Sequence, residues 1–192
     1  MIVGNLTLAN QLTILRIILI PAFVLLLVYG YLGASLLVFG FAGITDALDG
    51  LIARRAGQRT RLGAWLDPMA DKLLLVTTFI VLTIPAIPLT NHVPLWLTVS
   101  VISRDIVIIG VVAIVNLAVG PRTFRPSIWG KMTTAALILT SVIVMYFNYR
   151  VERSVLVDVA IWISFALTAL SAADYFLRLR LLINEPPPSA ST

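Results

Sequence analysis

The chain has 192 residues, of which 59% are hydrophobic and only 12% are charged, and its formal net charge is +5 at pH 7. A soluble domain carries roughly 25% charged residues, so this composition excludes an ordinary soluble protein and predicts an integral membrane protein. The chain has no cysteine, which excludes a disulfide framework and a thiolate metal site. Its basic residues lie between apolar segments, so we assign the positive charge to the membrane edge and expect no nucleic-acid partner.

Six apolar segments, each about as long as a membrane-spanning helix of roughly 20 residues, follow one another along the chain. They cover residues 9–29, 32–53, 63–84, 94–119, 127–148 and 155–178. None shows the strict alternation of a membrane β-strand. We therefore expect an all-α integral membrane protein, a six-transmembrane-helix bundle, forming one membrane domain over residues 1–182. Residues 183–192 are rich in Pro and Ser and predict a disordered tail.

The first span carries three polar residues on one helical face, Asn10, Thr13 and Arg16, each three residues from the next. Polar side chains inside a span serve either as contacts between helices or as ligands of a substrate. The spacing alone leaves both roles open, so Asn10 and Thr13 are further candidates for a site.

Four aspartates in the second and third spans are the most informative feature of the sequence: Asp46, Asp49, Asp67 and Asp71. A carboxylate at membrane depth is costly and is rarely present without a partner and a function. Four of them would repel one another unless a cation lay between them. Hard divalent metal ions prefer carboxylate oxygen, so the cluster predicts a site for one or two such ions.

The spacing of these aspartates places them on two helical faces that can converge. The second span puts four residues on one face, at i, i+3, i+4 and i+7: Asp46, Asp49, Gly50 and Ala53. The third span puts three residues on another face, at i, i+4 and i+8: Gly63, Asp67 and Asp71. The glycines leave room for a bulky ligand or for close helix packing, and Arg54 is suited either to a phosphate or to the membrane edge.

Further cations could bind the phosphate of an acceptor substrate: Arg104, Lys131, Arg122 and Arg125. Arg104 and Lys131 could instead extend to the membrane surface, as long basic side chains near helix ends do. An acceptor phosphate needs cations near the metal site, and because these residues could supply them, we favour a phosphorylated acceptor such as glycerol 3-phosphate over free serine or ethanolamine. Phosphatidylglycerol, a phosphodiester, would be attracted as well.

The distribution of basic residues predicts the orientation in the membrane. Arginines and lysines concentrate in the gaps after the second and fourth spans and in the tail. We therefore expect both termini and these gaps to face the cytoplasm, in the cell (inner) membrane. The aspartates lie near the cytoplasmic ends of their spans, so their site would open on that side.

The aspartate pattern resembles the motif of the CDP-alcohol phosphotransferase family at every fixed position. It consists of Asp46-x-x-Asp49-Gly50-x-x-Ala53-Arg54, then eight residues, then Gly63-x-x-x-Asp67-x-x-x-Asp71. Asn10-x-x-Thr13-x-x-Arg16 resembles the first-helix pattern of the family. Ser103-Arg104-Asp105 and Gly130-Lys131 resemble elements of its bacterial phosphatidylglycerophosphate synthase and cardiolipin synthase branches.

The resemblance implies a six-helix membrane enzyme, usually a homodimer, with two Mg²⁺ or Mn²⁺ ions in each active site. Such an enzyme moves a phosphatidyl group from CDP-diacylglycerol to an alcohol and releases CMP. By this resemblance the four aspartates bind the metal ions and Asp71 is the catalytic base. The resemblance also assigns five residues to the CDP pocket: Asp49, Gly50, Ala53, Arg54 and Gly63.

Other functions remain open on the sequence. A divalent-cation transporter would need polar residues through the whole membrane depth, whereas here they cluster near one side. A structural protein with a buried ion network is a third interpretation. Within the family, we expect glycerol 3-phosphate as the acceptor, with phosphatidylglycerol, and hence cardiolipin synthesis, as the alternative.

Overall fold

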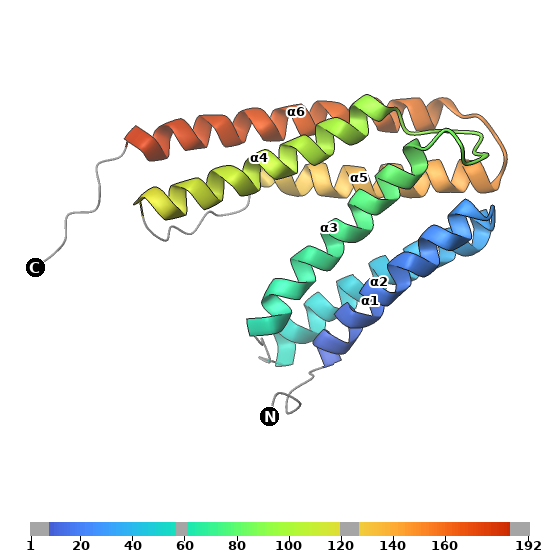
Figure 1. Ribbon diagram of the computed structural model, residues 1–192, viewed down its shortest axis with the longest axis horizontal. Coiled ribbons are helices and arrows are strands. Elements are labelled where there is room, and N and C mark those ends of the chain that lie inside the picture. Colours follow the sequence, from blue (N-terminus) through green and yellow to red (C-terminus); the bar gives the residue numbers. More distant parts are fainter. Residues whose placement is uncertain (1–7, 57–60, 120–126, 185–192) are drawn as a thin grey trace, which may run out of the picture. The chain divides into compact units, whose positions relative to one another are not determined.

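The computed structural model describes residues 8–56, 61–119 and 127–184. Within these ranges the protein is all-α, as predicted, and has six helices (Figure 1). They are α1 Leu8–Val28, α2 Leu32–Ala56, α3 Arg61–Thr83, α4 Leu95–Val119, α5 Ile128–Tyr149 and α6 Val155–Asn184. Each helix coincides with one predicted span, and α6 continues past the predicted end at 178. Residues 185–192 of the predicted tail lie outside the described residues.

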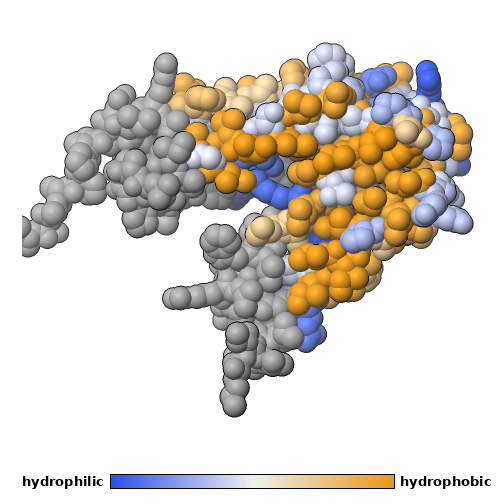
Figure 2. Space-filling model, viewed as in Figure 1, coloured by the Kyte–Doolittle hydropathy of each residue, from blue (hydrophilic) through white to orange (hydrophobic). Residues whose placement is uncertain are grey.

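Helix length and composition make this a multi-pass membrane protein. Among the described residues, three stretches are long and apolar enough to cross a membrane: Gln11–Val28, Ile128–Tyr149 and Val155–Leu177. The surface supports this interpretation, because large apolar side chains are widely exposed (Figure 2), including Leu37 at 75% and Ile18 at 63%. Such a surface would aggregate in water, whereas lipid tails solvate it.

The helices divide into two compact units, which are described separately below. The first unit contains residues 1–93 and 141–157, and therefore α1, α2, α3 and the last part of α5. The second contains residues 94–140 and 158–192, and therefore α4, most of α5 and nearly all of α6.

In the first unit, α1 packs against both α2 and α3. The core between α1 and α2 includes the rings of Phe23 and Phe39, whose centroids lie 5.8 Å apart. The chain leaves α1 at Gly30, where φ is 80° and a side chain would be strained. The N–H of Tyr31 donates to the carbonyl of Leu26 at 2.8 Å, which caps the end of α1 and lets α2 begin one residue later.

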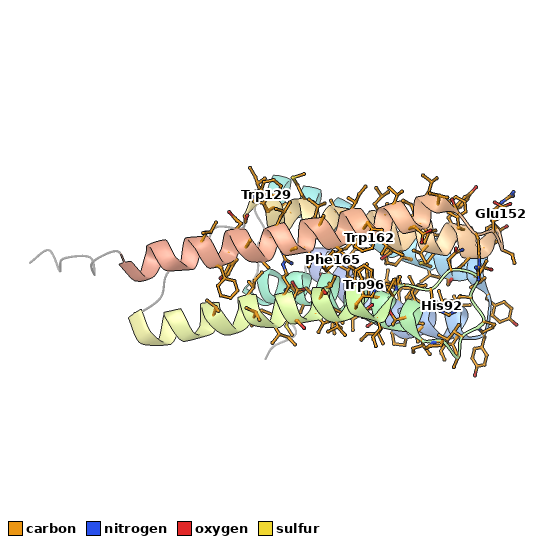
Figure 3. The ribbon with its side chains drawn as sticks, turned by 90° about the horizontal axis from the view of Figure 1, so that it is seen from above. His92, Trp96, Trp129, Glu152, Trp162 and Phe165 are labelled. Carbon is orange, nitrogen blue, oxygen red and sulfur yellow. The ribbon has the colours of Figure 1, made fainter. Side chains whose placement is uncertain are left out.

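In the second unit, hydroxyl groups link α5 to α6. The Thr133 hydroxyl donates to the carbonyl of Leu167 at 2.9 Å, and the Thr140 and Ser164 hydroxyls lie 2.8 Å apart. Small hydroxyl residues allow helices to approach closely in lipid. On α4 and α6, an aromatic cluster of Trp96, Trp162 and Phe165 adds ring contacts with centroids 5.0–6.1 Å apart (Figure 3).

Candidate active site

Two of the predicted metal ligands, Asp46 on α2 and Asp71 on α3, approach a single arginine from α1. Arg16 Nη2 lies 2.8 Å from Asp46 Oδ1, and Arg16 Nη1 contacts Asp71 Oδ1. The Arg16 side chain is only 1% exposed, whereas the two carboxylates are 42% and 45% exposed. The arginine therefore lies inside the helix packing, and the carboxylates lie over it where a ligand can reach them.

The packing of α1 against α2 and α3 explains why these three side chains meet. Arg16 and Thr13 are one turn apart on α1, and both are buried, so this face of α1 points into the unit. A guanidinium is always charged and would be costly to bury without partners. Carboxylates on both neighbouring helices meet that requirement.

The other predicted residues of this site lie in helical segments whose side chains are outside the described residues. They are Asp49, Gly50, Ala53 and Arg54 on α2, and Gly63 and Asp67 on α3. The side chain of Asn10 on α1 is outside them as well. In the sequence, Asp49 lies three residues after Asp46, and Asp67 lies four residues before Asp71.

The carboxylates suit a divalent metal ion. Asp46 and Asp71 come from different helices yet already share one positive charge, so their oxygens converge closely enough for a cation. Carboxylate oxygen is the ligand that Mg²⁺ and Mn²⁺ prefer. Among the described side chains, no three acidic or histidine residues gather at one point. The other two aspartates of the predicted ligand set, Asp49 and Asp67, are not among these described side chains.

The spacing of the sequence places Arg16 on one face with Asn10 and Thr13 but does not identify the partners of Arg16. A usable signal was present, because an arginine surrounded by apolar residues in a span requires an anionic partner at the same depth. The aspartates were the only acidic residues within the neighbouring spans.

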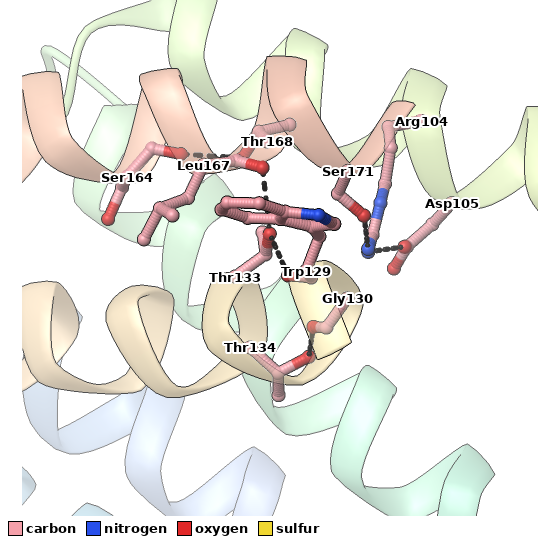
Figure 4. A network of polar contacts seen from close by, with 10 residues as sticks. All are labelled: Arg104, Asp105, Trp129, Gly130, Thr133, Thr134, Ser164, Leu167, Thr168 and Ser171. Atoms are coloured by element: carbon pink, nitrogen blue, oxygen red, sulfur yellow. Dashed lines mark hydrogen bonds and ion pairs between the residues drawn. The ribbon is translucent and has the colours of Figure 1, made fainter. Parts of the chain in front are cut away.

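A second polar cluster, in the other compact unit, surrounds Arg104. This side chain extends from α4 towards α6 and α5 (Figure 4). Its Nη1 lies 2.8 Å from Asp105 Oδ1, and its Nη2 donates to the Ser171 hydroxyl at 2.5 Å. The guanidinium can lie this close to α5 because residue 130 is a glycine: a Cβ there would lie 3.3 Å from Arg104 Nη2. The side chain is only 12% exposed, so most of it lies within the packing of this unit.

Lys131 directly follows Gly130 on α5, and its side chain is exposed. The guanidinium of Arg104 lies against the backbone of Gly130, so Arg104 and Lys131, the two predicted acceptor-binding cations, share one region of this unit. Asp105 and Ser171 use only part of the hydrogen-bonding capacity of Arg104. Arg122 and Arg125 lie outside the described residues.

A largely apolar groove runs along α4 and α6 beside Arg104. Its volume is about 310 Å³, and its lining includes Ser103, Arg104, Val107, Phe165 and Phe176. The groove thus combines an apolar wall with one cation, which is the character of a site for an amphiphile.

Comparison with known proteins identifies the class of protein that carries this arrangement. Residues 6–170 match the family model of the CDP-alcohol phosphatidyltransferases. The match spans most of the sequence, and so the chain belongs to the CDP-alcohol phosphatidyltransferase family. It is therefore an enzyme, a phospholipid-synthesising transferase with membrane helices.

Named relatives fall in two branches of this family. A probable phosphatidylglycerophosphate synthase of Mycobacterium tuberculosis is 35% identical over 181 residues, which cover 89% of this chain and 80% of that protein. A CDP-diacylglycerol–glycerol-3-phosphate 3-phosphatidyltransferase of Pseudomonas fluorescens is 38% identical over 144 residues, or 71% of this chain and 70% of that protein. A CMP-forming cardiolipin synthase of Homo sapiens is 33% identical over 189 residues, or 88% of this chain and 60% of that protein. Because these identities are similar in the two branches, they do not show which alcohol this enzyme uses as its acceptor.

Proposed function

We propose that this enzyme transfers the phosphatidyl group of CDP-diacylglycerol to glycerol 3-phosphate, giving phosphatidylglycerol phosphate and CMP. The observation that carries the transferase chemistry is the shared ion pair of Asp46 and Asp71 with the buried Arg16. It supports a site where carboxylates from α2 and α3 act together. Asp49 and Asp67 complete the proposed ligand set for two Mg²⁺ or Mn²⁺ ions, and the family is one that uses divalent metals.

In the proposed reaction, the acceptor hydroxyl oxygen attacks the phosphorus that carries the diacylglycerol. A P–O bond forms, the phosphoanhydride bond breaks, and CMP leaves with the bonding electron pair. Asp71 takes the hydroxyl proton as a general base. The bound metal ions supply charge neutralisation for the diphosphate. Asp49, Gly50, Ala53, Arg54 and Gly63 are the proposed contacts of the CDP part.

The acceptor assignment rests on the cations of the second unit. Arg104 retains hydrogen-bonding capacity beyond Asp105 and Ser171, and Lys131 adds a mobile point charge one residue after Gly130. Together they offer a phosphate monoester two charge-assisted contacts. Asn10, Thr13, Arg122 and Arg125 remain further candidates for substrate contacts.

Cardiolipin synthesis, with phosphatidylglycerol as acceptor, is the second candidate. The observation in its favour is the apolar groove beside Arg104, because a lipid acceptor needs a surface for its acyl chains as well as a cation for its phosphate. The human cardiolipin synthase also resembles 88% of this chain.

We further propose that the enzyme lies in the cell membrane as a homodimer, with its site facing the cytoplasm. The orientation is supported by the basic gaps of the sequence. The homodimer is carried over from the family resemblance.

An acceptor panel tests the function. Purified enzyme is incubated with CDP-diacylglycerol, Mg²⁺ and either glycerol 3-phosphate, phosphatidylglycerol or serine, and CMP and the lipid product are measured. We expect metal-dependent CMP release with phosphatidylglycerol phosphate as the main product. Asp67→Asn should lose at least 100-fold in rate while the protein still inserts, and Asp158→Asn, which changes an exposed aspartate on α6, should stay near wild type.

Full turnover in excess EDTA would contradict the metal-dependent mechanism. Cardiolipin as the main product, with little turnover of glycerol 3-phosphate, would replace the first candidate by the second.

A further inference from the structure

Arg16 stands apart from the other charged residues with described side chains, because it is almost wholly buried and joins two helices besides its own. Its 1% exposure compares with 12% for Arg104 and 54% for Arg150. Its partners lie on α2 and α3. One side chain of α1 therefore connects both helices that carry the aspartate motif.

The geometry suits the planar guanidinium in particular. Nη1 donates a hydrogen bond to Asp71 and Nη2 forms an ion pair with Asp46, so two separate nitrogens contact carboxylates from two helices at once. A lysine ammonium is a point charge on a flexible stem and cannot hold two separated carboxylates with the same fixed orientation. Each contact uses Oδ1 of its aspartate, and each carboxylate is more than two-fifths exposed.

We propose that Arg16 is a positioning residue for the phosphatidyl transfer. From its buried position, it fixes the rotamers of Asp46 and Asp71 so that the exposed oxygens of both carboxylates point at one divalent metal ion. It also offsets the repulsion between the two carboxylates before the ion binds. This inference rests on the proposed metal site, and it gives the polar face of α1 a role in that site. Groups that orient metal ligands in this way typically alter metal affinity or activity by about 10–100-fold when removed.

Mn²⁺ binding provides the test, because it is measured without turnover. Wild type, Arg16→Gln and Arg16→Lys are purified in detergent, and free Mn²⁺ is followed by electron paramagnetic resonance during a titration. We expect Arg16→Gln to bind Mn²⁺ about 10–100-fold more weakly. Arg16→Lys should recover only part of this loss, because charge returns without the planar geometry. Arg150→Gln, which breaks an exposed ion pair with Glu152, is the matched control and should bind as wild type.

A second measurement separates positioning from folding. Thermal unfolding of each variant is recorded in detergent without metal, and the steady-state constants are determined with saturating metal. If Arg16 is a positioning residue, kcat of Arg16→Gln should fall by a larger factor than the KM for CDP-diacylglycerol changes. Folded Arg16→Gln with unchanged Mn²⁺ affinity would overturn the proposal and leave a purely structural tie. Tighter Mn²⁺ binding would overturn it as well, since Arg16 would then compete with the metal. Complete recovery by Arg16→Lys would overturn the proposed orienting role of the guanidinium, because charge alone would then suffice.

The two proposals fail in different ways. If wild-type enzyme binds no Mn²⁺, the proposed metal site is wrong and Arg16 has no ion to position. If wild type binds Mn²⁺ and Arg16→Gln binds it equally well, only the role of Arg16 is wrong.

Discussion

Arg104, the proposed ligand of the acceptor phosphate, is held in place by contacts with three neighbouring residues. Asp105 and Ser171 hold its guanidinium between helices, and the absence of a side chain at Gly130 lets it lie against α5. A cation held this firmly loses little side-chain entropy when an anion binds. Lys131, one residue beyond Gly130, is exposed and free to adjust its position.

At this scale we predict that Arg104→Gln and Lys131→Gln each raise the KM for glycerol 3-phosphate by about 10–100-fold. The loss of one charge-assisted contact costs about 1.5–3 kcal/mol, which corresponds to that range. The KM for CDP-diacylglycerol should change much less, because the aspartates are untouched. Initial rates over a matrix of both substrate concentrations give the two constants.

Arg153→Gln, a change in an exposed residue between α5 and α6, serves as the control and should leave both constants unchanged. An equal rise in both KM values would indicate a folding role for Arg104. An unchanged KM for glycerol 3-phosphate, together with good turnover of phosphatidylglycerol, would favour the cardiolipin branch.

The connections between helices show how buried amides hold the first unit together. The Asn148 side chain near the end of α5 accepts from the Asn91 N–H at 2.7 Å and donates to the Asn91 carbonyl at 2.9 Å. The Asn91 amide in turn donates to the Glu152 carbonyl at 2.7 Å. In the turn between Asn148 and Glu152, Val151 has φ of 55°, which is strained for a β-branched residue. The amide network therefore holds a turn that the local sequence disfavours.

For this element we predict that Asn148→Ala lowers the free energy of unfolding by about 1–3 kcal/mol. The substitution leaves the buried N–H and carbonyl of Asn91 without their side-chain partner. The thermal midpoint in detergent, followed by circular dichroism, should fall by about 2–4 °C for each kcal/mol. Tyr146→Phe, at an exposed position of the same helix, should leave the midpoint close to wild type. A midpoint equal to wild type for Asn148→Ala would show that the turn is held by other contacts.

At the scale of the whole molecule, the broad apolar surface and the long helices require a bilayer, and the basic gaps predict its orientation there. Orientation decides which substrates can reach the site. Glycerol 3-phosphate and the nucleotide part of CDP-diacylglycerol are polar, so the proposed site must open to water, and the basic gaps predict that it does so on the cytoplasmic side.

The orientation is testable by cysteine labelling, because the chain has no cysteine of its own. A cysteine at Gln58, in the basic gap between α2 and α3, should be protected from a membrane-impermeant maleimide in intact cells. A cysteine at Glu152, whose side chain is 51% exposed between α5 and α6, should react. Both should react after the cells are permeabilised, which controls for accessibility. The reverse pattern in intact cells would invert the orientation.

The sequence by itself determined the membrane class, the positions of all six helices within the described residues and the spacing of the aspartate motif. These features are local: hydrophobicity sets the length of a span, and helix periodicity sets which neighbours share a face. The motif also led to the enzyme family, because its residue types recur at fixed intervals.

Only the tertiary structure decided which side chains meet. Arg16 and Asp71 are 55 residues apart, Asn91 and Asn148 are 57 apart, and Arg104 and Ser171 are 67 apart. Hydrophobic periodicity could not pair them, because lipid is as apolar as a helix interior and membrane helices need no contrast between an inner and an outer face. Ile18 is 63% exposed and Phe23, five residues later, is fully buried, although both are large and apolar. The partners of the buried charges were therefore fixed by helix packing, which no local pattern encodes.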